Sequence, residues 1–373
     1  MATTTSPASP TAMPKRIFNF SAGPATLPES VLLQAREDIL SIFGSGIGIM
    51  EHSHRGKEFI RVIEEAEADC RTLANISDDY AVLFLQGGAT TQFATIPMNF
   101  LPSGKTADYL NTGVWTTKAI KEAKNLGSVN VAFEGKDCDF DHVPTQEELS
   151  LTDGAAYLHY CSNNTIFGTQ YKTLPSSDAP LIADMSSDIF SRPLDINAHA
   201  MIYAGAQKNL GPAGTALIII RKDFMETGAA GLPSMFDYRQ HAAKGSSLNT
   251  PPTFGIYVIG QVFKWLLNQG GIDTLNTRNI EKSALLYDAI DTSNGFYSCV
   301  SKPECRSLMN VSFKSPNADL DAKFVQEALD NDMSGLKGHR SAGGLRASIY
   351  NAFPRQGCEV LAQFMRDFTK ANG

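Results

Sequence analysis

Seven short apolar runs between residues 81 and 221 set the first limit on the fold of this chain. They read AVLFLQGG, ADYLNTG, VNVAFEG, AAYLHYCSNNT, PLIADMSSD, MIYAGAQK and TALIIIRK, and most of them close with Gly, Asp, Asn or Thr. Segments able to form crossover helices lie between several runs, for example Thr91 to Phe100 and Thr116 to Leu126. Buried strands that alternate with helices predict an α/β domain with a mostly parallel seven-stranded sheet.

The last two runs are joined only by the segment KNLGPAG, from Lys208 to Gly214. Parallel neighbouring strands need a crossover connection of about a dozen residues or more, usually a helix. We therefore expect one of these two strands to run antiparallel to its neighbour. The pattern does not determine the order of the strands in the sheet.

Beyond the sheet-forming region the pattern changes, and the segment from Tyr257 to Gln269 reads as a helix that ends at Gly270. The elements expected after it are a helix over Arg278 to Asn294, a strand in SLMNVSF, a helix over Asp319 to Asn331, a strand in RASIYN and a helix over Arg355 to Lys370. This mixture predicts a smaller C-terminal α+β domain.

The expected division of the chain is a large domain over residues 17–270 and a small domain over residues 271–373, which the first residues of the large domain are able to pack against. Residues 1–16 begin MATTTSPASPTAMP and are rich in Thr, Ser, Ala and Pro. Such a composition predicts a disordered tail, and the tail lacks the apolar core of a secretory signal. We expect a cytoplasmic protein, with the plastid stroma left open as an alternative.

Composition excludes two classes of partner. No apolar run approaches the ~20 residues of a membrane span, so no membrane partner is expected. The 373 residues carry a net charge of −7, which offers no basic field for nucleic acid. An anionic ligand must therefore meet a local cluster of Arg, Lys or His. The six cysteines are scattered without a C-x-x-C pair, which is typical of reduced thiols.

A lysine and an aspartate stand at the ends of successive predicted strands. Lys208 lies in YAGAQKNLGPAG, and a buried amine beside glycines is suited to Schiff-base formation with a carbonyl. Asp184 closes PLIAD, where a carboxylate could hold a protonated pyridine nitrogen, as pyridoxal phosphate chemistry requires. The plainer alternatives are a solvated surface lysine and a helix-capping aspartate.

Two further features fit the same cofactor. The turn QGGATTQ, from Gln86 to Gln92, follows a strand and opens a helix, so its backbone N–H groups could bind a phosphate monoester. Trp115 follows another strand end and could stack on an aromatic ring. Glycine-rich turns without a phosphate and tryptophans in a core are common, so each feature is weak evidence alone.

Two His-Arg pairs are candidates for binding an anionic substrate. His54-Arg55 lies in EHSHRG, His339-Arg340 lies in GHRSAGGLR, and Arg346 ends the second segment. Arginine binds carboxylate or phosphate through two parallel hydrogen bonds, so this set suits a small substrate with two anionic ends. Solvated surface charge is the alternative. The H-x-H of the first segment could bind zinc, but no third ligand stands at metal spacing, and no metal is predicted.

Taken together, the segments resemble the phosphoserine aminotransferase family of fold-type I, class-V pyridoxal phosphate enzymes. The likeness covers nearly all of the chain after the tail. It is carried by FNFSAGPATLP, MEHSHRGKEF, FLQGGATTQF, GVW, SNNTIFGT, IADMSSD, YAGAQKNLGPAG, NTPPTFGIY and GHRSAGGLRASIYNA. The GATT form of the phosphate-binding turn is similar to that of plant-type members, and many relatives have Gly, Arg or Cys there.

The resemblance implies a role for each matched residue. It implies that Lys208 forms the internal aldimine, that Asp184 pairs with the pyridine nitrogen and that Trp115 stacks on the ring. It further implies that the cofactor is contacted by Thr165, Ala89, Thr90 and Gln207, and by Asn249 and Thr250 of a neighbouring subunit in a homodimer. For the substrate, it implies that Arg346 binds the α-carboxylate. The second substrate anion would be bound by His54, Arg55, His339 and Arg340.

The resemblance implies a reversible transamination in serine biosynthesis. L-glutamate would give its amino group to 3-phosphohydroxypyruvate, forming O-phospho-L-serine and 2-oxoglutarate. Other readings stay open: a transaminase for another amino acid, a cysteine desulfurase or lyase on the same scaffold, or a phosphate-binding protein without covalent chemistry. The G-x-x-x-x-G-K-[ST] pattern of nucleotide-binding loops is absent, which disfavours the last reading.

Overall fold

The computed structural model describes residues 15–373. Most of the predicted tail, residues 1–14, lies outside the described residues. Lys15 forms an ion pair with Asp332, and Arg16 lies 3.6 Å from a carboxylate oxygen of Glu29.

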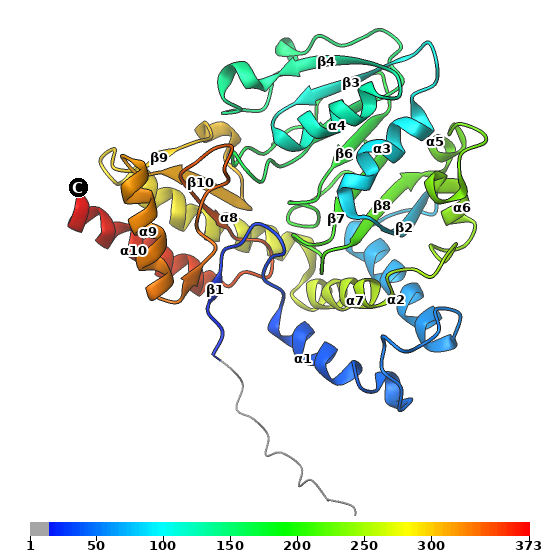
Figure 1. Ribbon diagram of the computed structural model, residues 1–373, viewed down its shortest axis with the longest axis horizontal. Helices are drawn as coiled ribbons and strands as arrows, with labels where there is room; N and C mark the ends of the chain where they lie inside the picture. Colours follow the sequence, from blue (N-terminus) through cyan, green and yellow to red (C-terminus); the bar gives the residue numbers. More distant parts are fainter. Residues whose placement is uncertain (1–14) are drawn as a thin grey trace, which may run out of the picture.

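All seven apolar runs form strands of one sheet, as the sequence predicted (Figure 1). The strand order is β2-β8-β7-β6-β5-β3-β4. Only the pairings of β8 with β2 and with β7 are antiparallel, so β8 is the reversed strand expected from the short KNLGPAG connection. The strands are β2 (Tyr80–Gln86), β3 (Thr106–Asn111), β4 (Ser128–Glu134), β5 (Leu158–Cys161), β6 (Leu181–Asp184), β7 (Met201–Gly205) and β8 (Thr215–Arg221).

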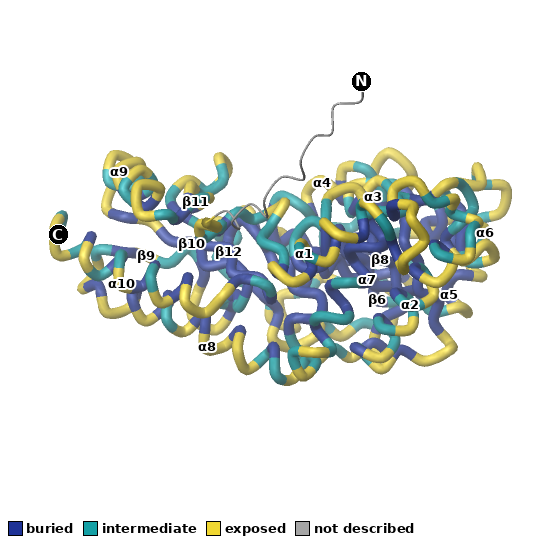
Figure 2. Tube along the Cα trace, turned by 90° about the horizontal axis from the view of Figure 1, so that it is seen from below, coloured by how far each residue is buried: buried dark blue, intermediate teal, exposed yellow. Residues whose placement is uncertain are grey.

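Helices cover both faces of this sheet, because its strands are apolar on both sides (Figure 1). Val82, Phe84 and Ile219 belong to the core beneath α1, α2 and α7, whereas Leu83 and Ile218 belong to the core beneath α3 and α4. The helices are α1 (Glu29–Asp38), α2 (Lys57–Ala74), α3 (Gly88–Phe100), α4 (Val114–Lys124), α5 (Lys222–Glu226), α6 (Tyr238–Ala242) and α7 (Thr253–Asn268). Figure 2 shows the central strands as the buried layer.

The C-terminal part has its own sheet and core. Its three-stranded antiparallel sheet has the order β12-β10-β9 and packs with α8, α9 and α10 (Figure 1). The elements are α8 (Gly271–Asp291), β9 (Ser298–Cys299), β10 (Asn310–Lys314), α9 (Ala318–Asp330), β11 (Met333–Ser334), β12 (Leu345–Ser348) and α10 (Arg355–Asn372). This is the α+β arrangement that the sequence predicted.

The start of the described chain joins this second part. Strand β1 (Phe18–Asn19) pairs in parallel with β11, and Phe20 lies in the C-terminal core. A break between the two parts at Gly270 remains a prediction, supported by these separate cores and by the positive φ of Gly270 between α7 and α8.

Short 3-10 helices complete the structure: η1 (Ile42–Gly44), η2 (Gly135–Cys138), η3 (Gln146–Glu148), η4 (Ser234–Phe236) and η5 (Pro303–Cys305). None of the helices within residues 15–373 combines the length and the apolar character needed to cross a membrane.

Candidate active site

The candidate site lies at the carboxyl ends of β5, β6 and β7, which are neighbours in the sheet. Parallel strands bring the residues that follow them to one edge, the usual ligand site of an open α/β sheet. Asp184 ends β6, while Thr165 and Lys208 follow β5 and β7. Strand pairing therefore assembles three residues that are far apart in the sequence.

The Lys208 ammonium points at Thr165 and Trp115. Its Nζ donates a hydrogen bond of 2.6 Å to Thr165 Oγ1 and lies 5.0 Å from the centre of the Trp115 ring. Burial lowers the pKa of Lys208 from its ordinary value, and the nearby Asp184 charge opposes this shift. A lysine held in this way has an enlarged neutral fraction, the nucleophilic form needed for imine formation.

Asp184 is 4% exposed, and one of its oxygens is already engaged. Its Oδ1 accepts hydrogen bonds from the Ser186 amide at 2.9 Å and the Ser186 hydroxyl at 2.6 Å. Among residues 15–373, Oδ2 has no hydrogen-bond partner. Burial raises the pKa of Asp184, while Lys208 and Ser186 lower it. This environment suits a carboxylate that pairs with a second buried cation, such as a pyridinium N–H.

Gly113 allows Trp115 to approach the Thr165 loop. Gly113 has a φ of 155°, and a Cβ there would stand 1.8 Å from Asn164 Nδ2. Trp115 lies in the first turn of α4, and its Nε1 is buried without a hydrogen-bond partner. The exposed part of the ring and this unused donor leave Trp115 fit to hold a flat ligand.

The glycine-rich turn lies beside the lysine loop. Gly87 and Gly88 have φ values of 94° and 64°, and α3 begins at Gly88. A Cβ on Gly205 would lie 3.3 Å from the Ala89 amide nitrogen, so the end of β7 passes directly over the start of α3. Gln207 Oε1 is buried without a partner nearby. The site thus offers the backbone N–H groups of a helix N-terminus to a phosphate group.

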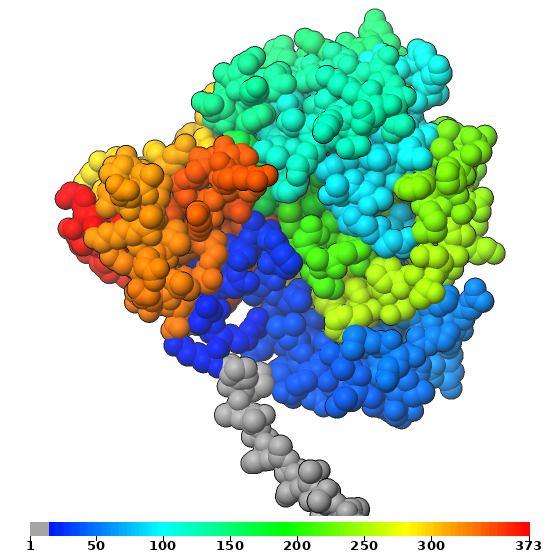
Figure 3. Space-filling view, in the orientation of Figure 1, coloured from blue at the N-terminus to red at the C-terminus, as the bar shows by residue number. Residues whose placement is uncertain are grey.

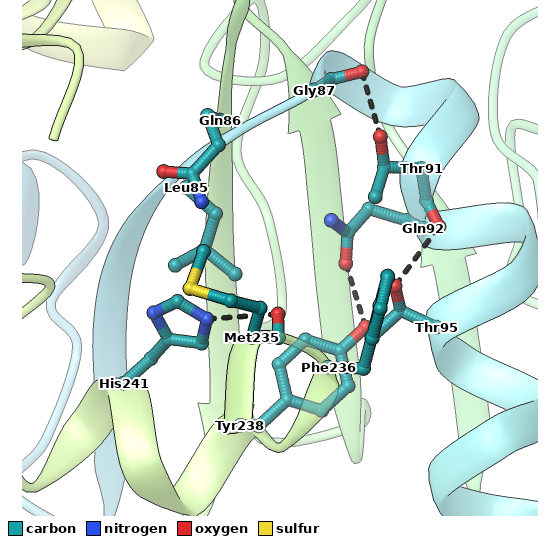
Figure 4. Close-up of a pocket in the computed structure, with 10 residues that line it drawn as sticks. All are labelled: Leu85, Gln86, Gly87, Thr91, Gln92, Thr95, Met235, Phe236, Tyr238 and His241. Carbon is teal, nitrogen blue, oxygen red and sulfur yellow. Dashed lines mark hydrogen bonds between the residues drawn. The ribbon is translucent and has the colours of Figure 1, made fainter. Parts of the chain in front are cut away.

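Figure 4 shows the other side of this turn, where a pocket separates it from α6. The hydroxyl of Tyr238 donates a 2.6 Å hydrogen bond to Gln92 Oε1, and Thr91 Oγ1 donates to the Gly87 carbonyl at 3.0 Å (Figure 4). These bonds hold the first turn of α3 from behind. The pocket is lined by Leu85, Gln86, Gly87, Thr91, Gln92, Thr95, Met235, Phe236, Tyr238 and His241.

Arg346 reaches the same site from β12. Its Nη1 donates to the Thr165 carbonyl at 3.1 Å, and its Nε is buried without a partner. Thr165 therefore touches both Lys208 and Arg346. Burial lowers the pKa of Arg346, because the charged guanidinium is partly removed from water. An anionic ligand bound beside it would stabilise that charge.

His339 and Arg340 lie on the loop before β12, and sequence reasoning missed another cation near them, Lys118. Burial and the charges of Arg346, Arg340 and Lys118 lower the pKa of His339. Lys118 stands one turn after Trp115 on α4, with its Nζ 4.8 Å from that ring. The i,i+3 spacing from Trp115 was the available signal. Figure 3 shows the orange C-terminal part meeting the cyan part of the large domain on this face.

Four predicted residues are not joined to this cluster within one chain. His54 and Arg55 lie on the loop before α2, and Asn249 and Thr250 on the loop before α7. No hydrogen bond or ion pair in the described part of the chain links their side chains to Lys208, Asp184 or Arg346. Asn249 Oδ1 is buried without a partner.

In two groups of potential metal ligands, side chains already contact other protein side chains. His52, the other histidine of H-x-H, contacts Glu58 at 3.6 Å and Ser45 Oγ at 2.9 Å. The only clustered potential ligands found within residues 15–373 are Cys138, Asp141 and His142. Lys302 Nζ lies 3.5 Å from Asp141 and 3.3 Å from His142, so a protein cation occupies that position.

Comparison with known proteins agrees with this geometry. The family model Aminotransferase class-V matches residues 17–361. The phosphoserine aminotransferase of Desulfotalea psychrophila is 53% identical over 96% of this chain and 99% of its own. The chloroplastic phosphoserine aminotransferase 1 of Arabidopsis thaliana is 50% identical over 95% of this chain and 83% of its own.

A solved structure extends the likeness to the backbone. The PLP-bound phosphoserine aminotransferase of Trichomonas vaginalis is 40% identical, covers 94% of this chain and 100% of its own, and superposes with a TM-score of 0.90. The buried Asp184, the unpaired Trp115 Nε1 and the close approach of Gly205 to the start of α3 fit that cofactor. The chain belongs to the aminotransferase class-V family and, within it, to the phosphoserine aminotransferases, which use pyridoxal 5'-phosphate.

Proposed function

We propose that this enzyme transfers the amino group of L-glutamate to 3-phosphohydroxypyruvate, reversibly, with the residues of the candidate site in the roles given below. The observation that carries the proposal is the convergence of Asp184, Trp115, Thr165 and Arg346 around Lys208. Pyridoxal phosphate, when bound, supplies an electron sink that stabilises negative charge at the substrate Cα.

Lys208 acts as the cofactor-bearing amine and as the acid–base group. Its lowered pKa gives a neutral amine that could move a proton between the substrate Cα and the cofactor carbon next to the transferred nitrogen, on one face. Asp184 keeps a buried positive charge on the ring nitrogen through its free Oδ2. Trp115 holds the ring plane, and Ala89, Thr90 and Gln207 hold the phosphate through N–H or O–H donors.

The cations explain how one pocket accepts two different substrates. Arg346, with its unpaired Nε, binds the α-carboxylate that glutamate and phosphoserine share. His339 and Arg340, with His54 and Arg55, bind the second anion, which is a carboxylate in one substrate and a phosphate in the other. Lys118 adds a positive charge over the ring of Trp115.

The site is completed by a second subunit. His54, Arg55, Asn249 and Thr250 have no contact with Lys208 in their own chain, which a shared site in a homodimer would explain. The segment between α1 and α2 and the first turn of α2 also expose large apolar side chains, as an interface that a partner covers would. These are Leu40, Phe43, Ile47, Met50 and Ile60.

A cytoplasmic location is proposed, with the plastid stroma as the alternative because the Arabidopsis relative is named chloroplastic. Imaging of the full-length chain fused to a fluorescent protein separates the two compartments.

The experiment is a substrate screen of the cofactor-loaded protein. Glutamate would be supplied with 3-phosphohydroxypyruvate, oxaloacetate, pyruvate or glyoxylate, and 2-oxoglutarate would be measured. We expect kcat/KM to be highest with 3-phosphohydroxypyruvate by at least about 100-fold, because a dianion gains most from the cation cluster. Equal or better turnover of an acceptor without phosphate would contradict the proposal.

A further inference from the structure

Three asparagines bind three consecutive backbone carbonyls in the turn after Asp184. Asn209 Nδ2 donates to the Ile189 carbonyl at 2.6 Å, Asn351 Nδ2 to the Phe190 carbonyl at 2.9 Å, and Asn279 Nδ2 to the Ser191 carbonyl at 2.9 Å. All three asparagines are buried. We refer to these three side chains and their three carbonyl acceptors as the asparagine clamp.

The clamp is itself connected. The Asn351 amide N–H donates to Asn209 Oδ1 at 3.0 Å, and Asn279 Nδ2 also donates to Asn351 Oδ1 at 2.8 Å. Each bond lies inside the protein, where a carbonyl without a hydrogen-bond partner is destabilising. The clamp therefore behaves as one network rather than as three separate contacts.

The turn that the clamp holds is strained. Phe190 has a φ of 55° and is fully buried, although a bulky residue rarely adopts that conformation. Such a conformation persists only where the surrounding structure imposes it, and strain of this kind is found near functional sites. Here the imposing contacts are the three asparagine amides.

Each part of the clamp is tied to a different site residue. The turn begins directly after Asp184, Asn209 is the residue after Lys208, and Asn351 follows Arg346 by five residues, just beyond β12. Asn279 comes from α8 in the C-terminal part. Lys282 lies one turn further along α8. It holds the segment around Asn351 by donating hydrogen bonds to the carbonyls of Ile349, Tyr350 and Phe353.

We propose that the asparagine clamp is a positioning device that sets Arg346 on the C-terminal part against Lys208 and Asp184 on the sheet. This inference rests on the proposed roles of those three residues. Asparagine suits the task because one short side chain offers both a donor and an acceptor. Loss of one asparagine amide leaves a carbonyl of the strained turn without its hydrogen bond. A small shift of the turn or of the Asn351 segment would then change the position of Arg346 relative to Lys208.

The test compares Asn351→Ala and Asn351→Asp with the wild type, all loaded with cofactor. Asn351→Asp keeps the acceptor for Asn279 and removes the donor to Phe190, with almost no change in size. The control is Asn99→Ala, because Asn99 is also buried and donates to two carbonyls, of Thr95 and Phe236, away from the clamp.

Two measurements separate positioning from stability: the pH midpoint of the cofactor's visible absorbance, and kcat with KM for glutamate and 3-phosphohydroxypyruvate. We expect both Asn351 variants to move the pH midpoint by about half a unit or more and to lower kcat about tenfold or more with both substrates. The Asn99 variant should lose thermal stability without moving the midpoint.

The possible failures are distinguishable. If the cofactor-loaded wild type showed no visible absorbance from pyridoxal phosphate, the proposed function would be wrong, and the clamp proposal that rests on it would be wrong as well. A normal wild type together with a folded Asn351→Asp variant of unchanged midpoint and kcat would overturn the clamp alone. If Asn351→Ala does not fold, Asn351→Asp decides the question.

Discussion

Burial favours the neutral forms of Lys208 and Asp184, whereas the charge of each group favours the charged form of the other. Burial lowers the lysine pKa and raises the aspartate pKa, and their mutual attraction opposes both shifts. A bound ring carrying its own positive charge would take over the partnership with Asp184. Lys208 would then be released to act as a neutral amine.

Arg346 and Arg55 are expected to respond differently to truncation. Arg346→Ala should lower kcat/KM for both glutamate and 3-phosphohydroxypyruvate by roughly 30-fold or more, since each substrate loses a charged hydrogen-bond pair worth about 2 kcal/mol. Arg55→Ala should affect the phosphorylated substrate several-fold more than glutamate, because a dianion loses more from a missing cation. Steady-state kinetics with both substrates check this, and equal losses in the Arg55 variant would contradict the division of roles.

His339 should take up a proton when the phosphorylated substrate binds. Burial and the neighbouring cations lower its pKa in the free enzyme, so the imidazole is mostly neutral near pH 7. A bound phosphate favours the charged form and raises that pKa, so affinity should increase as pH falls toward the ordinary histidine range. Calorimetry of O-phospho-L-serine binding in two buffers of different ionisation enthalpy measures the uptake. His339→Gln should reduce it, and an unchanged uptake would contradict the assignment.

Local sequence singles out some residues as site candidates, and their roles remain predictions. Lys208 stands out because glycines and apolar strands surround it, and Asp184 because it closes an apolar run. Lys118 was missed although its i,i+3 spacing from Trp115 was a local signal. Asn279 and Asn351 were missed because the roles proposed for them depend on contacts between segments more than 70 residues apart. No local pattern records such contacts.

At the scale of elements, the apolar runs located all seven strands of the large sheet. The C-terminal helix expected from Arg278 begins seven residues earlier, at Gly271. Gly270 and Gly271 have φ values of 94° and 74°, and the helix begins at the second of these two glycines. Helices α1 and α2 lie outside the region where the sequence pattern was interpreted. Strand order was not predictable, because it depends on long-range pairing.

The start of α4 provides an element-scale prediction. Gly113→Ala should displace Trp115 and weaken cofactor binding about tenfold or more, because the new Cβ would overlap Asn164 at 1.8 Å. Gly104→Ala is the matched control, since Gly104 also has a positive φ, of 83°, but faces open space. Fluorescence titration of both apo variants with pyridoxal phosphate gives the dissociation constants. Equal affinities would show that Gly113 does not set the position of Trp115.

At the scale of the whole molecule, subunit mixing tests the shared site. A Lys208→Ala chain and an Asn249→Ala/Thr250→Ala chain should each be nearly inactive alone. In a mixed dimer one site receives its lysine from one chain and its Asn249 and Thr250 from the other, so it is intact. Random exchange should restore roughly one quarter of wild-type activity per subunit. Activity that stays at the level of the separate variants would indicate that each site lies within one chain.

The central claim is that Lys208 is the amine that carries pyridoxal phosphate. The most direct test is borohydride reduction of the loaded wild-type enzyme, followed by proteolysis and mass spectrometry. We expect one reduced pyridoxyl adduct, on the peptide that contains Lys208, and none in Lys208→Ala. An adduct on another lysine, or an equal yield from the Lys208→Ala chain, would contradict the account.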